Sequence, residues 1–197
     1  DLRDVDREAL SADLTRDIEI LDELIGYARV VTPDRDAKLA ELRALIAEKT
    51  GAGQINPGNR KILIFSAFAD TATYLYDQLA ADLQRTHGLT CAQVTGTRNR
   101  VAGKRRARGG FEDILGRFSP RSKETIGLAQ REGEIDIVFA TDCISEGQNL
   151  QDCDCVINYD VHWNPVRIVQ RFGRVDRLGS TNKHIQMVTF WPDVDLE

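Results

Sequence analysis

The chain has 197 residues, and 42% of them are hydrophobic, which is enough for one sizeable core with an appended subdomain. Its formal net charge of -5 argues against a protein that coats nucleic acid with its whole surface, so any contact with a polyanion must be confined to a local groove. No segment is long and apolar enough for a transmembrane helix and the first residues lack a signal-peptide pattern, so we expect a cytoplasmic protein with no membrane partner.

The N-terminal quarter of the chain is predicted to be helical. Residues 7–31 repeat apolar side chains at helical spacing among many acids, which predicts an amphipathic helix. Those apolar positions are Leu10, Leu14, Ile18, Leu21, Leu24 and Ile25. Pro33 ends the pattern, and a second helix is expected over residues 36–49. We therefore predict a helical extension over residues 1–55 and a separate domain over residues 56–197.

The rest of the chain alternates between strand and helix patterns. Residues 61–66, Lys-Ile-Leu-Ile-Phe-Ser, form an apolar run without alternation, which is typical of a strand buried on both faces of a parallel sheet. A helix is expected to follow as far as Gly88. Further strands are expected over residues 89–95, 135–141, 155–159 and 184–190. This alternation predicts an α/β fold in which a parallel sheet carries helices on both faces.

The segment from residue 97 to residue 134 is rich in basic side chains and then in apolar ones, so part of it is expected to be a helix that covers the sheet. The basic residues are Arg98, Arg100, Lys104, Arg105, Arg106 and Arg108. Clustered Lys and Arg gain affinity for nucleic acid by releasing counterions, which favours a contact with a phosphate backbone. A solvated surface loop is the alternative, and both interpretations stay open.

Four cysteines occur, at positions 91, 143, 153 and 155. Cys153 and Cys155 lie in or beside an apolar strand-like run, where small buried thiols are common. We therefore interpret them as core residues rather than as metal ligands or disulfide partners, and we expect no metal site.

Ligands of parallel α/β sheets bind at the carboxyl ends of the strands, and several polar residues are expected there. Thr141 and Asp142 follow the strand over residues 135–140. Gly147 permits close approach of the backbone to a ligand. Asn149 offers a donor and an acceptor that suit ribose hydroxyls or a backbone clamp.

A helix with two arginines is expected next, from the cap Asn164 to a stop at Gly179. Gln170, Arg174 and Arg177 would share one face of it. An opposite apolar face, with Ile168, Phe172 and Val175, would pack on the sheet. Two guanidiniums on one braced face suit a phosphate, because each offers a planar fork of donors and stays charged. The alternative, surface salt bridges on a solvated helix, is disfavoured by the strand-end residues just upstream.

Taken in chain order, these segments resemble motifs of one family. Residues 61–66 resemble motif IV, Thr95-Gly96 the short element that contacts phosphates, residues 141–150 motif V and residues 170–177 motif VI. Several motifs in register make a chance match far less frequent than one motif alone. Over about residues 36–191 the chain is similar to the second RecA-like lobe, the C-terminal domain, of superfamily-two helicases. Within that group it most resembles the Swi/Snf-type translocases of double-stranded DNA.

The resemblance implies a RecA-like sheet of the P-loop NTPase type and a role for each matching residue. Arg174 and Arg177 would be arginine fingers that reach the γ-phosphate of ATP, and Gly147, Asn149 and Gln170 would lie near the nucleotide. Thr95, Gly96 and Thr141, together with Arg98 and Arg100, would contact nucleic-acid phosphates. The implied cofactors are ATP and magnesium, and the implied partners are DNA, or RNA, and the first RecA-like lobe of the same parent polypeptide.

Two features of the sequence qualify this resemblance. It contains no Gly-x-x-x-x-Gly-Lys-Ser/Thr loop and no strand that ends in paired acids, so it holds half of an active site and is expected to be inactive alone. Asp176 stands where the RNA-helicase branch has glycine, which favours DNA. A catalytically silent module that binds nucleic acid or protein is the alternative function. A complete nucleotide-dependent enzyme is disfavoured, because the glycine loop is missing.

Overall fold

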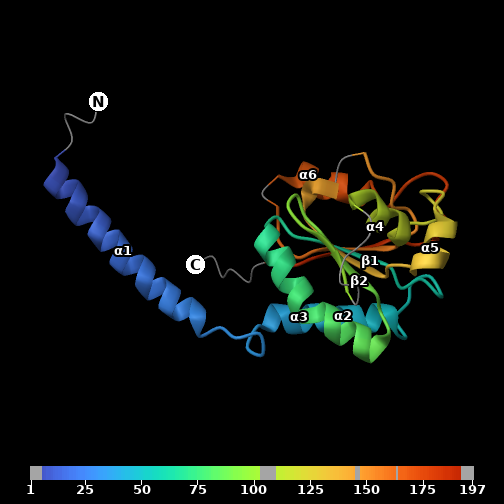
Figure 1. The fold of residues 1–197 in the computed structure, drawn as a ribbon, viewed down its shortest axis with the longest axis horizontal. Coiled ribbons are helices and arrows are strands. Elements are labelled where there is room, and N and C mark those ends of the chain that lie inside the picture. Colours follow the sequence, from blue (N-terminus) through green and yellow to red (C-terminus); the bar gives the residue numbers. More distant parts are fainter. Residues whose placement is uncertain (1–5, 103–109, 145–146, 163, 192–197) are drawn as a thin grey trace. The chain divides into compact units, whose positions relative to one another are not determined.

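The computed structural model describes residues 6–102, 110–144, 147–162 and 164–191, which form two compact units, one up to Glu41 and one from Leu42 onward (Figure 1). In the first unit, helix α1 (Arg7–Arg29) begins at Asp6, whose carboxylate accepts hydrogen bonds from the backbone N–H groups of Glu8 and Ala9 at 3.0 and 3.2 Å. The predicted first helix is thus confirmed. No side chain of α1 is buried.

Six strands of the second unit form one sheet in the order β3-β2-β4-β1-β5-β6. They are β1 (Ile62–Phe65), β2 (Cys91–Val94), β3 (Asn99–Val101), β4 (Ile137–Ala140), β5 (Cys155–Asn158) and β6 (Gln186–Thr189). Neighbouring strands are parallel except β2 and β3, which are antiparallel. The five parallel strands therefore bring their carboxyl ends to one edge of the sheet.

The five strands predicted from the sequence all form, and β3 is the one that was missed. It has three residues, lies at the edge of the sheet and follows β2 after a tight turn in which the backbone N–H of Thr95 donates to the carbonyl of Arg98 at 2.8 Å. A strand this short does not show a period-two pattern. The sheet is consequently mixed, with a single antiparallel edge strand, rather than fully parallel.

Helices cover both faces of the sheet, as predicted (Figure 1). Helix α3 (Ala69–His87) and the later part of α2 (Ala37–Thr50) lie on one face, while α4 (Phe111–Phe118), α5 (Ile126–Glu132) and α6 (Pro165–Phe172) lie on the other. α3 ends at Gly88, whose φ of +62° lies in the left-handed region that glycine adopts without strain. None of the described helices is long and apolar enough to cross a bilayer.

The core is built from alternate side chains of the strands. Phe65 of β1 belongs to a buried cluster with Ile114 and Phe118 of α4. On the opposite face, Phe139 of β4 meets Tyr76 of α3 edge-on, with ring centroids 6.2 Å apart. Both faces of the central strands are therefore buried, which explains why β1 and β4 show no polar alternation in the sequence.

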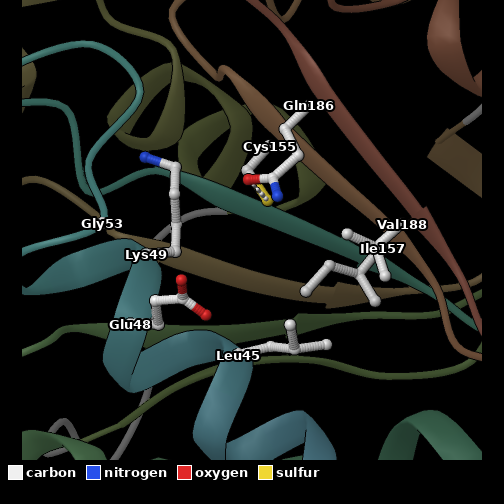
Figure 2. A pocket seen from close by; sticks show the side chains of 8 residues that line it. All are labelled: Leu45, Glu48, Lys49, Gly53, Cys155, Ile157, Gln186 and Val188. Carbon is white, nitrogen blue, oxygen red and sulfur yellow. Dashed lines mark hydrogen bonds between the residues drawn. The ribbon is translucent and has the colours of Figure 1, made fainter.

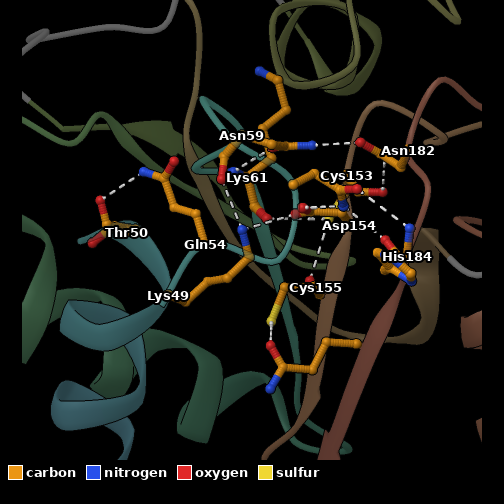
Figure 3. A network of polar contacts seen from close by, with 12 residues as sticks. Lys49, Thr50, Gln54, Asn59, Lys61, Cys153, Asp154, Cys155, Asn182 and His184 are labelled. Atoms are coloured by element: carbon orange, nitrogen blue, oxygen red, sulfur yellow. Dashed lines mark hydrogen bonds and ion pairs between the residues drawn. The ribbon is translucent and has the colours of Figure 1, made fainter. Parts of the chain in front are cut away.

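A buried polar network ties the end of α2 to the strands (Figure 3). Lys49 and Asp154 form an ion pair at 3.0 Å, and their side chains are 4% and 0% exposed. Asn56 donates to the other oxygen of Asp154 at 2.8 Å and accepts from the backbone N–H groups of Lys183 and His184. These partners offset the free-energy cost of burying the charged carboxylate of Asp154. Removal of one partner would leave a buried charge without compensation and would destabilise the fold. The network thus fixes the amino ends of β5 and β6 to α2.

The interface between α2 and the last two strands is closely packed. A cavity of about 30 Å³ remains there, close to the volume that one water molecule needs (Figure 2). It is lined by Leu45, Glu48, Lys49, Gly53, Cys155, Ile157, Gln186 and Val188. This space is too small for an organic ligand, so the interface is structural.

The cysteines differ in reactivity. Burial raises the pKa of Cys91 and of Cys155 to about 12 and that of Cys153 further, whereas Cys143 is exposed. Because the thiolate is the reactive form, we expect iodoacetamide at pH 8 to modify Cys143 and to spare the other three until the chain unfolds. Mass spectrometry of digested protein, with and without urea, measures this. Rapid native modification of Cys91 or Cys155 would contradict the buried positions.

Candidate functional site

Polar side chains gather at the carboxyl ends of the parallel strands, where the sequence predicted a site. Thr95 follows β2, Ser66 follows β1, and Thr141 and Asp142 follow β4. The backbone N–H of Thr141 donates to the carbonyl of Val94 at 3.2 Å, so the ends of β2 and β4 lie side by side. The hydroxyl of Ser66 donates to Asp160 beyond β5, which joins the ends of β1 and β5.

Arg171 contacts the ends of three strands at this edge, a role that was not predicted from the sequence. Its side chain is fully buried and makes a two-pronged contact with Asp142, Nε to Oδ1 at 2.7 Å and Nη2 to Oδ2 at 3.0 Å. Nη1 donates to Asn158 at 2.9 Å, and the guanidinium lies over the ring of Phe65 at 4.9 Å. The arginine therefore connects α6 to the ends of β4 and β5 through charge-assisted hydrogen bonds and to the end of β1 through a cation–π contact.

The predicted helix from Asn164 to Gly179 is wrong in length, although its cap is confirmed. The Asn164 side chain accepts from the N–H of Val166 at 3.0 Å, but α6 ends at Phe172 and the chain continues through Gly173 in tight turns. The carbonyl of Arg174 accepts from the N–H of Leu150 at 2.9 Å instead of from the next helical turn. Glycine disfavours a helix interior, and this tertiary hydrogen bond completes the break.

Arg174 and Arg177 consequently lie beyond the helix, not on one helical face with Gln170. Gln170 is exposed on α6, Arg177 is exposed, and Arg174 is half-buried. Val175 between them is fully buried in the core cluster, which anchors the turn, while Ile168 and Phe172 are only partly buried. Gly179 has a φ of +90°, so its left-handed conformation is as predicted, although it does not end a helix.

Neither of these two arginines forms an ion pair within the described part of the chain. No described carboxylate pairs with either guanidinium, and Nε of Arg174 is buried without a hydrogen-bond partner. Arg177 lines an open hollow of about 390 Å³ together with Asp176, Leu178 and Lys183, although Asp176 forms no ion pair with it. A buried donor without a partner is costly, so this arrangement favours an incoming acceptor.

Gly147 and Asn149 lie in the segment that follows β4. Gly147 has a φ of +72° and no atom near the position of a Cβ, so its backbone is open to a ligand. Asn149 is half-buried, and its Oδ1 has no hydrogen-bond partner among the described atoms. It lines a second hollow of about 260 Å³ with Leu178 and Gly179. The segment from 147 to 150 and the turn from 174 to 179 are therefore neighbours.

The loop between α4 and α5 holds this segment in place. Asp152 accepts hydrogen bonds from the backbone N–H groups of Arg121 and Ser122 at 2.7 and 3.0 Å. Lys123 donates to Gln148 and forms an ion pair with Glu112 at 3.1 Å. The position of the strand-end loop thus depends on residues that are distant in sequence.

The residues predicted to bind nucleic acid lie on the β2–β4 side of the same edge. Thr95 is buried, and its hydroxyl accepts from the N–H of Arg98 at 3.0 Å, which closes the turn that exposes Gly96. Arg98 is exposed and Thr141 is half-exposed. The backbone N–H groups of Thr95 and Thr141 and the hydroxyl of Thr95 are used within the turn and the sheet, so exposed Gly96 and Arg98 and the half-exposed Thr141 side chain are the groups that face solvent here.

Arg100 is placed differently from Arg98. Its guanidinium lies over the ring of Tyr76 at 4.3 Å, pairs with Asp77 at 2.8 Å and donates to Gln93. Much of its hydrogen-bonding capacity is thus used by α3 and β2. Lys104, Arg105, Arg106 and Arg108 lie outside the described residues, as do Ser145 and Glu146 within the predicted motif V.

The donor set at this edge suits phosphates better than metals. Within residues 6–102, 110–144, 147–162 and 164–191 there is no group of three or more His, Cys, Asp or Glu side chains that could hold a metal ion. Asp142, the carboxylate at the end of β4, is already engaged by Arg171. The described side chains of this edge thus include arginines that can bind phosphate, and no group of carboxylates among them that can hold a metal ion.

The sequence matches the family described as the helicase conserved C-terminal domain over residues 37–179. The uncharacterized ATP-dependent helicase YqhH of Bacillus subtilis is 53% identical over 48 residues, which are 24% of this chain and 9% of YqhH. The ATP-dependent RNA helicase ROK1 of Gibberella zeae is 25% identical over 172 residues, which are 87% of this chain and 22% of ROK1. The chain thus matches less than a quarter of the length of either relative.

Among solved structures, the C-terminal part of the Fun30 ATPase domain superposes with a TM-score of 0.52 at 20% identity. The match covers 94% of this chain and 54% of that one. At this level of identity the likeness concerns the fold, and it confirms the RecA-like sheet that the sequence predicted.

Proposed function

Because this chain belongs to the helicase conserved C-terminal domain family of superfamily-two ATP-dependent helicases, we propose that it is the second lobe of an ATP-driven motor that moves along DNA. The first RecA-like lobe of the same parent polypeptide would supply the other wall of the nucleotide site. Residues 56–197 would form the sheet and most of the lobe, and residues 1–55 would be a helical extension whose last part, the later half of α2, packs on that sheet.

The observation that carries this proposal is the pair Arg174 and Arg177 in the turns that follow α6, neither of which forms an ion pair among the described residues. An arginine that reaches the transferring phosphoryl group stabilises the negative charge that develops there. Both guanidiniums fit this chemistry, because their donors are available and they cannot lose their protons. Bound ATP supplies a γ-phosphoryl group for transfer to water, and the two arginines would orient it and neutralise it.

Other residues of the edge would bind without taking part in bond breaking. Gly147, Asn149 and Gln170 would line the nucleotide, with the open backbone at Gly147 allowing close approach. Magnesium would be held mainly by the first lobe, since no set of carboxylates among the described residues is free to bind it. Arg171 would hold the strand ends in register without touching the nucleotide, because it is fully buried.

The polymer would be held on the β2–β4 side of the edge. Thr95, Gly96 and Thr141 would contact phosphates, with Arg98 contributing charge. Arg100 would contribute less, because Asp77 already neutralises it. We propose DNA as the polymer on the basis of Asp176, and the ROK1 likeness makes RNA the competitor to include in assays.

The isolated chain should be inactive. We expect it to hydrolyse ATP at the background rate and to bind ATP weakly, because its sequence has no loop that cradles phosphates. Phosphate release with and without DNA, together with calorimetric titration of ATP, measures both properties, and the full-length parent serves as the positive control. Turnover by the isolated chain that DNA stimulates would contradict the division of the site between two lobes.

A further inference from the structure

Helix α1 exposes an apolar stripe along its length. Six aliphatic side chains recur there at helical spacing, and each is between 44% and 58% exposed. They are Leu10, Leu14, Ile18, Leu21, Leu24 and Ile25, and we call them the α1 stripe. A helix owes most of its stability in a protein to the packing of such a face. A contiguous exposed apolar surface of this kind therefore marks an interaction site.

The spacing within the α1 stripe selects a helix as the occupant. Four of its members follow one another at intervals of four, three and four residues, namely Leu14, Ile18, Leu21 and Ile25. That repeat is the seam of a coiled coil, in which the side chains of one helix fit between those of its partner. Isoleucine and leucine alternate along the seam, an order that favours two strands, so we expect one partner helix.

The charges beside the α1 stripe select a basic partner. Asp13, Asp17 and Asp22 lie three or four residues from members of the stripe and border it, whereas Arg16 lies on the opposite side of the helix. α1 as a whole has six acidic side chains and three arginines, so its net charge is -3. A helix with Lys or Arg beside its own apolar seam would complement these carboxylates across the interface.

Other occupants conflict with the same charges. A second copy of α1 would place its own bordering aspartates against these three in either orientation, and like charges repel. Nucleic acid and anionic lipid are also negative. The relatives are far longer than this chain, which matches 9% of YqhH and 22% of ROK1, so a parent of similar length has ample chain to supply a partner helix. A helix on the same polypeptide also has a high effective concentration.

We infer that the α1 stripe docks a basic amphipathic helix of the parent polypeptide that lies outside these 197 residues, an inference that rests on the proposed function. The two helices pack side by side, which buries the aliphatic side chains of both. The three bordering aspartates then pair with Lys or Arg of the partner. α1 is thereby a fixed attachment of this lobe to another part of the motor and not a free linker.

Amide hydrogen exchange compares the docked and undocked helix. In the full-length parent, the amides of residues 10–25 should exchange about tenfold more slowly, or slower still, than in the 197-residue chain, which lacks the partner. Leu21→Asp in the parent should restore the fast exchange. Ala12→Asp is the matched control, because Ala12 is exposed on the opposite side of α1 and gains the same charge, so it should keep the slow exchange. In the 197-residue chain both variants should melt like the wild type, since no side chain of α1 is buried.

Charge reversal and crosslinking test the chemistry of the partner. Asp17→Lys in the parent should speed the exchange of α1 several-fold, whereas Glu19→Lys, on the opposite side of the helix, should not. Carbodiimide, which joins a carboxylate to a lysine in direct contact, should link Asp17 or Asp22 to a lysine of the parent outside the 197 residues. Equal exchange in the parent and in the isolated chain, or links only between two copies of α1, would overturn the inference.

The proposed function is tested separately from this docking. Arg174→Ala in the parent should abolish ATP turnover and leave the exchange of α1 unchanged. If α1 exchanges fast in the parent while Arg174→Ala is inactive, the docking inference alone is lost. If Arg174→Ala keeps full turnover, the proposed role of the chain in a motor fails, whatever the exchange of α1 shows.

Discussion

Replacing either Arg174 or Arg177 by alanine in the full-length parent is expected to lower ATP turnover by about 10³- to 10⁵-fold, the range found for arginines supplied to phosphoryl transfer. The reason is electrostatic, since each guanidinium would neutralise charge that develops on the transferring group. Affinity for DNA should change little, because the proposed backbone contacts lie at Thr95, Gly96 and Thr141. Phosphate release and a DNA-binding titration under the same salt conditions measure the two effects separately.

A lysine replacement separates the effect of the positive charge from that of the planar guanidinium. Arg174→Lys keeps the charge but loses the planar fork of donors, so it should restore only a small part of the turnover. Arg131→Ala is the matched control, because Arg131 is exposed on α5, which leads into the amino end of β4. Full turnover by the alanine variants of Arg174 and Arg177 would favour the alternative of a silent binding module.

Replacing Arg171 should have the second large effect, and it should act on stability. Arg171→Ala removes the partner of Asp142 and of the buried Asn158, and loss of one member of a buried ion pair costs about 3–5 kcal/mol. The lower end of that range is expected, because the side chain of Asp142 is 25% exposed and water can partly replace the arginine. Urea unfolding of the 197-residue chain, followed by circular dichroism, gives the difference in free energy of unfolding.

Two further variants separate packing from charge at this position. Arg171→Lys should recover part of the loss, since one ammonium cannot reproduce the contacts with both Asp142 and Asn158. The double variant Asp142→Asn with Arg171→Met removes the charge from both sides and should be less damaging than Arg171→Ala alone. A free energy of unfolding for Arg171→Ala within 1 kcal/mol of the wild type, the upper value for an exposed pair, would show that this ion pair is not structural.

The central strands could be predicted because a strand that is buried on both faces is apolar at every position. β1 and β4 are apolar at every position, since helices cover both of their faces, and no polar alternation confuses the pattern. β3 has no such run of apolar residues. It is a three-residue edge strand with exposed Asn99, and it is held mainly by backbone hydrogen bonds to β2. β3 forms because the turn at Thr95 brings it alongside β2. That pairing depends on the rest of the sheet as well as on the local sequence.

The position of the site at the carboxyl ends of the strands was predicted from the sequence, but the contacts between its side chains were not. Periodicity assigns charged residues to the solvent side of a helix, so it could not indicate that Arg171 turns inward while Val166 and Val169 turn outward. Asp142 lies 29 positions earlier in the chain, and no spacing rule connects the two. The spacing that seemed to align Gln170 with Arg174 assumed a helix through Gly173, which the hydrogen bond from Leu150 to Arg174 interrupts.

The most direct measurement is the affinity of the full-length parent for ADP with aluminium fluoride, which mimics the transferring phosphoryl group, compared with its affinity for ADP alone. If Arg174 and Arg177 contact that group, the wild type should prefer the analogue strongly. The double variant Arg174→Ala with Arg177→Ala should then lose the preference while still binding ADP. An equal preference in wild type and double variant would contradict the proposal that this chain completes the nucleotide site with its two arginines.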